Sequence, residues 1–237
     1  MKIFKDKKSL IDEISNKKNI AFVPTMGSIH EGHLSLIKKA KKDSKNVLVS
    51  IYVNPKQFNV NSDFKKYPRN IRKDIAILKK TKVKYLYLPT YADIYSFRPI
   101  LPVYLDRFSK KLCGKFKPGH FKGVVNVVNR FIEIIKPSLI YLGLKDFQQL
   151  NLIKLHINKK KIRTKIIACT TIREKNGIAL SSRNILLNKQ QIEIAVRIYK
   201  YLKNIKKKIV PANLKKKKLD ILNKIFLLGA KKIDYLE

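Results

Sequence analysis

Two histidines three positions apart precede an amphipathic segment and could contact the phosphates of a nucleotide. His30 and His33 belong to residues 24–33, which follow an apolar run typical of a buried strand. At a helix start the two imidazoles would share one face, beside backbone N–H groups that have no partner within the helix. Gly27 and Gly32 allow a ligand to approach the backbone closely. The pattern favours a phosphate site, although packing or metal binding explains many isolated His-x-x-His pairs.

Two further expected loops carry polar groups that suit a small substrate. Asn54 and Gln57 follow a second apolar run and could hydrogen-bond a polar molecule beside an aromatic side chain. The alternative is an Asn-Pro turn in which the glutamine is merely exposed. In the next loop Gly143 would allow close approach, and Lys145 offers a cation for phosphate. Asp146 could hold a ribose or could only cap the following helix.

A fourth loop, residues 170–184, places hydroxyl groups beside an arginine. Ser181, Ser182 and Arg183 form a phosphate-binding combination, although a common one. His120 opens another expected helix, where a structural or supporting role is favoured. The loops hold almost no carboxylate, which argues against acid–base hydrolysis, and no Cys/His cluster, which argues against zinc. Donors and cations of this kind suit charge stabilisation during transfer at a nucleotide phosphate.

The elements that must position these loops alternate between strand and helix. Apolar runs predict strands at residues 20–23, 47–53, 83–88, 139–142 and 165–169. Amphipathic spacing predicts helices at residues 34–45, 69–80, 121–135 and 146–159, with an irregular stretch at 89–118. Such alternation predicts right-handed βαβ units and an α/β fold with a doubly wound parallel sheet. Ligands bind beyond the carboxyl ends of such strands, where the loops described above begin.

The pattern changes toward the end of the chain. We expect one domain over residues 1–171 and a smaller α+β domain over residues 172–237. The smaller domain would hold two helices around Pro211. Lysine-rich faces, expected to be solvated, fall at residues 206–208 and 215–218. Residues 233–237 resemble the start of a strand, which predicts that this domain is truncated.

The composition sets limits on partners and compartment. The net charge of +38 suggests a polyanion partner, but only nine of the 54 basic residues are Arg, which base readers favour. Abundant Lys, Ile and Asn indicate a compositional bias instead, so we expect no specific nucleic-acid partner. No apolar run is long enough to span a membrane, and no secretory signal is visible. Cys113 and Cys169 lack any metal or redox spacing and are expected to be buried thiols in a reducing cytoplasm.

Six blocks of the sequence carry a resemblance to a known family. They are residues 22–36, 49–58, 67–70, 118–124, 145–150 and 178–184. In this order they resemble the pantoate–β-alanine ligase family, whereas His-x-Gly-His alone indicates only the wider adenylyl-transfer superfamily. The resemblance implies a Rossmann-like first domain, a C-terminal lid, and a cytoplasmic homodimer. It also implies a ligase of pantothenate biosynthesis that uses ATP to activate (R)-pantoate as an adenylate, which β-alanine then attacks.

The resemblance implies roles by matching position. His30 and His33 would contact the phosphates, with His33 the proton donor, and Lys145, Ser181 and Arg183 would stabilise phosphate charge. Gly143 and Asp146 would hold the nucleoside, and Mg²⁺ would arrive with ATP and take no protein ligand. The wider ATP site would comprise Met26, Gly27, Ser28, Ile29, His30, Glu31, Gly32, His33, Gly143, Leu144, Lys145, Asp146, Ile172, Leu180, Ser181, Ser182 and Arg183. Pantoate would contact Gln57, Gln149, Met26 and Asn54, and β-alanine would contact Gln57.

The chain departs from the family pattern at three places. Leu144 replaces a usual Glu before the lysine, and Lys117 replaces a usual Arg, a bidentate donor. The family also continues beyond residue 237 into its lid, whose closure excludes water. Two alternatives therefore stay open. The chain could be another adenylyl-transferring enzyme of the superfamily, or a decayed ligase fold that binds polyanions through its lysines.

Overall fold

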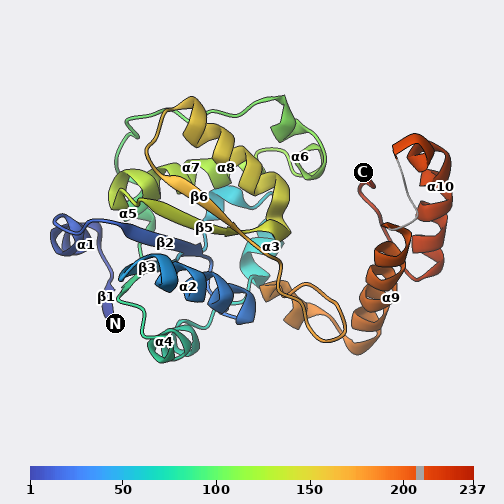
Figure 1. Cartoon of the computed structure of the whole chain (residues 1–237), viewed down its shortest axis with the longest axis horizontal. Helices are drawn as coiled ribbons and strands as arrows, with labels where there is room; N and C mark the ends of the chain where they lie inside the picture. Colours follow the sequence, from blue (N-terminus) through green and yellow to red (C-terminus); the bar gives the residue numbers. More distant parts are fainter. Residues whose placement is uncertain (207–210) are drawn as a thin grey trace. The chain divides into compact units, whose positions relative to one another are not determined.

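The computed structural model in Figure 1 describes residues 1–206 and 211–237. Six parallel strands form one sheet in the order β1-β4-β3-β2-β5-β6. The strands are β1 (Lys2–Phe4), β2 (Ile20–Thr25), β3 (Asn46–Ile51), β4 (Tyr85–Tyr87), β5 (Leu139–Gly143) and β6 (Lys165–Cys169). The strand order reverses beside β2, so the loops after β2 and β5 leave neighbouring strands at the same edge. The predicted α/β doubly wound parallel fold is confirmed.

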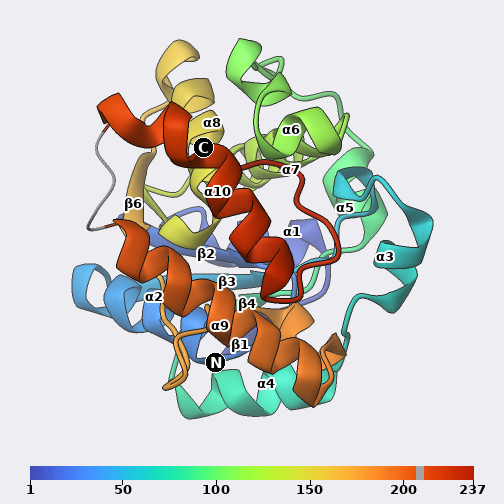
Figure 2. The same cartoon turned by 90° about the vertical axis from the view of Figure 1, so that its right-hand side faces the viewer.

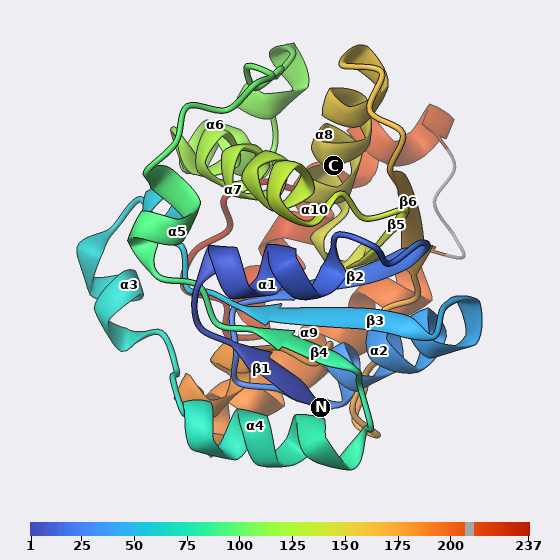
Figure 3. The same cartoon turned by 90° about the vertical axis from the view of Figure 1, so that its left-hand side faces the viewer.

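Helices cover both faces of the sheet. The α-helices are α1 (Lys7–Ile14), α2 (Glu31–Asp43), α3 (Asn61–Lys66), α4 (Ile71–Lys80), α5 (Tyr91–Tyr95), α6 (Cys113–Phe116), α7 (His120–Ile135), α8 (Phe147–Lys159), α9 (Lys189–Lys206) and α10 (Pro211–Leu227). Short 3-10 turns are η1 (Pro55–Gln57), η2 (Arg107–Lys110), η3 (Leu144–Asp146) and η4 (Ser182–Leu186). Figure 3 shows α1, α7 and α8 on one face of the sheet and α2 and α4 on the other.

Alternate strand residues fill the two apolar layers that these helices cover. Phe22 and Leu48 are fully buried in the layer shared with α1, α7 and α8. Val23 and Val49 are fully buried in the opposite layer, shared with α2 and α4. Burial on both faces explains why β2 and β3 are almost continuously apolar in sequence. The sheet is therefore a rigid base from which the loops at its carboxyl edge extend.

The predicted elements are present, with corrections at their ends. The helix expected from residue 34 begins at Glu31, because His30 already caps it. The strand expected at 83–88 covers only β4, and β2 and β5 each run further than predicted. The irregular stretch at 89–118 contains the short helices α5 and α6. Cys169 is buried as expected, but Cys113 is only half-buried, and both are free thiols.

The chain divides into two compact units, Met1–Ile172 and Arg173–Glu237. Considered by itself, the second unit contains η4, α9 and α10, and the two long helices are drawn in Figure 2. Its described residues also contain one isolated antiparallel bridge, between Arg173 and Ala179. The strand predicted at 233–237 is wrong: these residues are irregular, since no neighbouring strand among the described residues of this unit offers them a backbone partner.

The lysine-rich faces of the second unit are only partly covered by the structure. Lys206 and Lys217 are exposed, as expected for a solvated face. Lys218 is instead half-buried and pairs with Glu237 at 2.7 Å. Residues 207–208 and the side chains of 215–216 lie outside the described residues.

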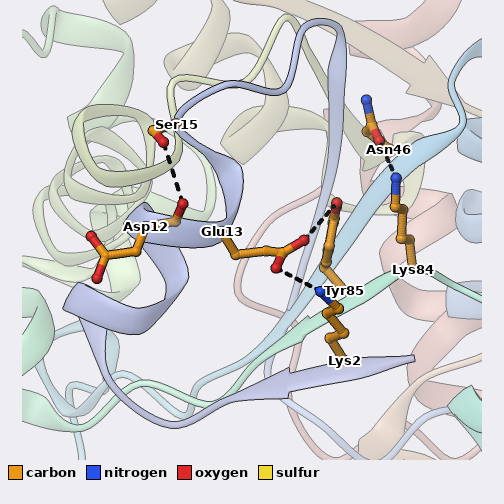
Figure 4. Close-up of polar contacts among 7 residues, drawn as sticks. All are labelled: Lys2, Asp12, Glu13, Ser15, Asn46, Lys84 and Tyr85. Atoms are coloured by element: carbon orange, nitrogen blue, oxygen red, sulfur yellow. Dashed lines mark hydrogen bonds and ion pairs between the residues drawn. The ribbon is translucent and has the colours of Figure 1, made fainter.

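A basic hollow lies at the amino ends of the strands, opposite the predicted site. It has a volume of about 560 Å³ and is lined by Met1, Lys2, Glu13, Lys17, Lys45, Lys79, Lys82, Val83 and Lys84. Figure 4 shows Lys2 donating to Glu13 at 2.7 Å, and Tyr85 donating to the same carboxylate. Helix C-termini gather at this edge, and lysines there offset the negative ends of the helix dipoles. In the described part of the chain, no helix is long and apolar enough to cross a membrane.

Candidate active site

The two histidines that opened the sequence analysis cap helix α2 with their own side chains. Nδ1 of His30 accepts the backbone N–H of Gly32 at 3.1 Å. Nδ1 of His33 accepts the backbone N–H of His30 at 3.4 Å. In a neutral imidazole one nitrogen accepts and the other donates, so this arrangement assigns the proton of each ring to Nε2. The pair can therefore cap the helix and still donate two hydrogen bonds to an anion.

Both imidazoles are held in the uncharged form. Burial, followed by the charges of His30 and Lys145, lowers the pKa of His33 to about 3. Burial and then the charge of Lys145 also lower the pKa of His30, against a smaller opposing effect of Glu31. Lys145 follows β5, which pairs with β2, so the loops that carry Lys145 and the two histidines leave neighbouring strands at the same edge of the sheet. Two neutral donors and one lysine thus share one corner.

The loop between β2 and α2 is fixed from outside by a buried carboxylate. Asp74 of α4 is 2% exposed and accepts the backbone N–H groups of Ser28 and Ile29, each at 2.8 Å. A Cβ at Gly27 would lie 2.9 Å from Asp74 Oδ2, so only glycine fits there without a shift. Ser28 has a φ of +51°, a left-handed conformation that costs an ordinary residue roughly 1 kcal/mol or more.

The loop after β3 presents a hydrogen-bonded row of amides. Asn54 is 1% exposed, and its Nδ2 donates to Gln57 Oε1 at 3.3 Å and to the carbonyl of Gly123 at 3.2 Å. The hydroxyl of Tyr95 donates to Asn54 Oδ1 at 2.9 Å, which fixes the orientation of the amide. Gln57 Nε2 in turn lies 2.8 Å from Met26 Sδ. The Asn-Pro turn of the alternative is present, because Asn54 accepts the backbone N–H of Lys56 at 3.2 Å. Gln57 is half-buried within this row, so its expected mere exposure is wrong.

Helix α7 supports this row from below. A Cβ at Gly123 would lie 2.1 Å from the carbonyl oxygen of Lys56, so glycine is what lets η1 rest against the helix. His120, the first residue of α7, contacts the carbonyl of Gln57 through Nδ1 at 2.7 Å. His120 therefore has the supporting role that the sequence analysis favoured.

The loop after β5 carries an ion pair between neighbours. Lys145 Nζ lies 2.9 Å from Asp146 Oδ1, and both side chains are more than a third exposed. Asp146 makes no side-chain hydrogen bond to the start of α8, so the capping alternative is wrong. Gln148 is buried and donates to the carbonyls of Phe108 and Lys111, both at 2.8 Å. The next residue, Gln149, is half-buried.

The fourth predicted segment belongs to the second unit and is described by itself. Ser181 caps η4 by accepting the backbone N–H of Arg183 at 3.3 Å. Ser182 is buried, Arg183 is exposed, and Leu180 is half-buried. Ile172, the last residue of the first unit, is also half-buried.

The first unit thus brings together two groups of predicted site residues. His30, His33 and Lys145 form a donor-rich corner, and Met26, Asn54 and Gln57 form a contiguous amide row. Among the described residues no group of three His, Cys, Asp or Glu is placed to hold a metal ion. Asp74 and Tyr95 were not among the residues predicted from the sequence. A lone acid beside buried Leu78 on the inner face of a lysine-rich helix was the signal for Asp74.

Comparison with known proteins gives consistent matches. The family model described as pantoate-beta-alanine ligase matches residues 2–237. A pantothenate synthetase of Fervidobacterium nodosum is 41% identical over 97% of this chain and 83% of its own length. One from Thermosipho africanus is 38% identical, over 100% of this chain and 85% of its own. A pantoate-beta-alanine ligase of Francisella tularensis, solved with beta-gamma ATP and beta-alanine, superposes with a TM-score of 0.88. It is 40% identical and covers 100% of this chain and 90% of its own.

Proposed function

The chain belongs to the pantoate–β-alanine ligase family, and we propose that it joins (R)-pantoate to β-alanine at the expense of ATP. In the first step a carboxylate oxygen of pantoate attacks the α-phosphorus of ATP, and the bond to pyrophosphate breaks. In the second step the amine of β-alanine attacks the acyl carbon of the adenylate. The amine loses a proton, AMP leaves, and the product is pantothenate. The chain is thus an AMP-forming ligase of pantothenate biosynthesis.

The observation that carries this proposal is the corner formed by His30, His33 and Lys145. Charge develops on the phosphate oxygens as pyrophosphate leaves, and fixed donors placed there lower the barrier. The neutral imidazoles would each donate a hydrogen bond from Nε2, while Lys145 supplies the positive charge. Because burial lowers its pKa, His33 is neutral and would donate a hydrogen bond from Nε2 to a phosphate oxygen, at the position where the family resemblance places the proton donor.

The amide row after β3 suits pantoate, which reacts with ATP in the first step. Gln57 and Gln149 would hydrogen-bond pantoate, Met26 and Asn54 would line its pocket, and Gln57 would also contact β-alanine. The row is fixed before any ligand arrives, because Asn54 is locked by Tyr95 and Gly123. A prearranged polar pocket discriminates between substrates more strongly than a flexible one.

The remaining nucleotide contacts complete the proposal. The backbone of residues 26–33 would line ATP, and Gly143 and Asp146 would hold the nucleoside, with Leu144 and Ile172 beside it. From the second unit, Ser181 and Arg183 would stabilise phosphate charge, and Leu180 and Ser182 would contact ATP. Mg²⁺ would enter as the counter-ion of ATP, bound to phosphate oxygens of the substrate itself.

We also propose a cytoplasmic homodimer. Both cysteines are free thiols, as is usual in a reducing compartment. The dimer is implied by the family resemblance, and light scattering on the purified chain measures it directly.

Two assays on the chain as written test the reaction. Pantoate-dependent exchange of labelled pyrophosphate into ATP measures the first step. AMP release that requires β-alanine measures the second. No exchange with pantoate at any ATP concentration would refute the proposed function, and exchange with another hydroxy acid alone would favour a different adenylyl-transferring enzyme.

A further inference from the structure

We infer that Asp74 is a positioning residue that sets the backbone shape of the ATP loop, residues 24–33. The inference rests on the function proposed above. Asp74 belongs to α4, which follows β3 and β2 in the chain, and 46 residues separate it from Ser28. Its two carboxylate oxygens each accept one backbone N–H from the loop: Oδ2 from Ser28 and Oδ1 from Ile29.

The shape of the loop is costly without this carboxylate. Gly27 and Ser28 have φ angles of +81° and +51°, and consecutive left-handed residues are rarely adopted by a free chain. Successive N–H groups that converge on one anion form a concave arrangement known as a nest. Here the anion is the protein's own carboxylate, which is buried and therefore not replaced by water. Immediately after the nest comes His30, whose ring starts α2 and donates toward the phosphates in the proposed mechanism.

Asp74 acts on the histidines through the shape of the loop that carries them. The charges that shift the pKa of His30 belong to Lys145 and Glu31, and those that shift His33 belong to His30 and Lys145. The pantoate side of the loop has a separate attachment, because Met26 contacts Gln57. Weakening the nest should therefore raise the KM for ATP much more than the KM for pantoate. It should leave the pH dependence of the reaction unchanged.

The test variant is Asp74→Asn, which keeps the shape of the side chain. One of its two positions becomes an NH₂ group facing a backbone N–H, so one hydrogen bond is replaced by a donor–donor contact. We expect the KM for ATP in the exchange assay to rise about tenfold, the size usual when a buried donor loses its acceptor. The KM for pantoate should stay within about twofold of the original. The shape of the pH profile should not change. Asp43→Asn is the control for the same change of side chain, because among the described residues that carboxylate accepts a hydrogen bond from Tyr141, away from the loop.

Three results separate the possible failures. A lowered melting temperature with equal loss toward ATP and pantoate overturns the inference, because loss of stability alone gives that pattern. Unchanged KM for ATP in Asp74→Asn also overturns it. If the unmodified chain shows no exchange, the proposed function fails instead, and calorimetric binding of a non-hydrolysable ATP analogue then tests Asp74 directly. About tenfold weaker analogue binding in Asp74→Asn, with Asp43→Asn unchanged, supports the inference even in that case.

Discussion

The imidazole rings of His30 and His33 are stacked, with centroids 4.0 Å apart and planes inclined by 28°. Each ring accepts a backbone N–H at the start of α2, so the same two side chains end a loop, begin a helix and face the proposed phosphate site. Stacking two rings at this distance is compatible with neutral imidazoles and opposed by two positive charges. The protonation state of the pair therefore connects stability with the site.

Acid should destabilise the protein before its carboxylates are protonated. The pKa of His33 falls to about 3 and that of the buried His156 to about 4 on folding, from the ordinary value of 6.5. A lowered folded-state pKa means that the unfolded chain binds more protons below pH 6.5. The stabilisation is therefore present above that pH and is lost as the pH falls toward 3. Melting temperatures measured between pH 7 and pH 4 should decrease steadily.

The contribution of the His33 ring to this pH dependence of stability can be measured separately. Replacing His33 with Asn removes one titrating group, so the slope of unfolding free energy against pH should decrease by about 1.4 kcal/mol per pH unit between pH 4 and 6. His120→Asn serves as the comparison, because that histidine lies outside the stacked pair. Equal slopes for the original chain and the His33 variant would contradict the lowered pKa.

Replacing Lys145 with Ala should slow adenylate formation at least about tenfold, as loss of one charge-stabilising group usually does. The side chain is exposed, and in the part of the chain that the structure describes its ion pair is with its neighbour Asp146, so the melting temperature should change little. The rate of pyrophosphate exchange at saturating ATP and pantoate measures the effect. Lys8→Ala, an exposed lysine of α1, controls for general loss of charge. A rate equal to that of the control would remove Lys145 from the site.

Introducing the family's usual acid at Leu144 should leave the exchange rate within about threefold. Leu144 is 38% exposed, so a glutamate is tolerated, and Lys145 already has a carboxylate partner in Asp146. The variant is Leu144→Glu, assayed alongside Leu144→Gln, which has the same shape without the charge. A tenfold gain for Glu and none for Gln would show that the charge orients the lysine after all.

Removing the hydroxyl of Tyr95 should weaken the binding of pantoate and spare ATP. Tyr95→Phe deletes one donor to Asn54 Oδ1 and leaves the amide held only by Lys56, Gln57 and Gly123 among the described residues, a loss of about 1 kcal/mol or about fivefold in KM for pantoate. Tyr91→Phe is a close control, since this ring packs against Tyr95 but its side chain is half exposed. A parallel rise in the KM for ATP would mean that the whole sheet edge had moved.

The main strands and helices could be predicted from the sequence because their hydrophobic patterns are local. Buried parallel strands such as β2 and β3 are continuous apolar runs, and α7 has a broad apolar face that periodicity detects. Glycines and histidines at strand ends located the donor-rich corner before its geometry was known. The three-residue strand β1 was not predicted and β4 was predicted too long, because such short strands have no periodicity and their ends depend on pairing with neighbouring strands.

Contacts between distant segments could not be predicted in the same way. Asp74 reaches Ser28 across 46 residues and Tyr95 reaches Asn54 across 41, and neither pair has a spacing that a periodic pattern records. The start of α2 was placed too late because histidine is an unusual capping residue, and its role appears only when both Nδ1 contacts are seen. Such supports act through tertiary packing and therefore require the structure.

The pairing of β2 with β5 has a consequence for synthesis. Ala21 of β2 pairs with Leu139 of β5. The edge of β2 that faces β5 therefore has no hydrogen-bond partner until well over half of the chain has left the ribosome. An apolar strand with an unpaired edge is prone to join another chain, and sheets built from distant segments fold slowly. Nascent chains that end before β5 should therefore aggregate or require a chaperone, and the corner of His30, His33 and Lys145 cannot form until Lys145, which follows β5, has been synthesised.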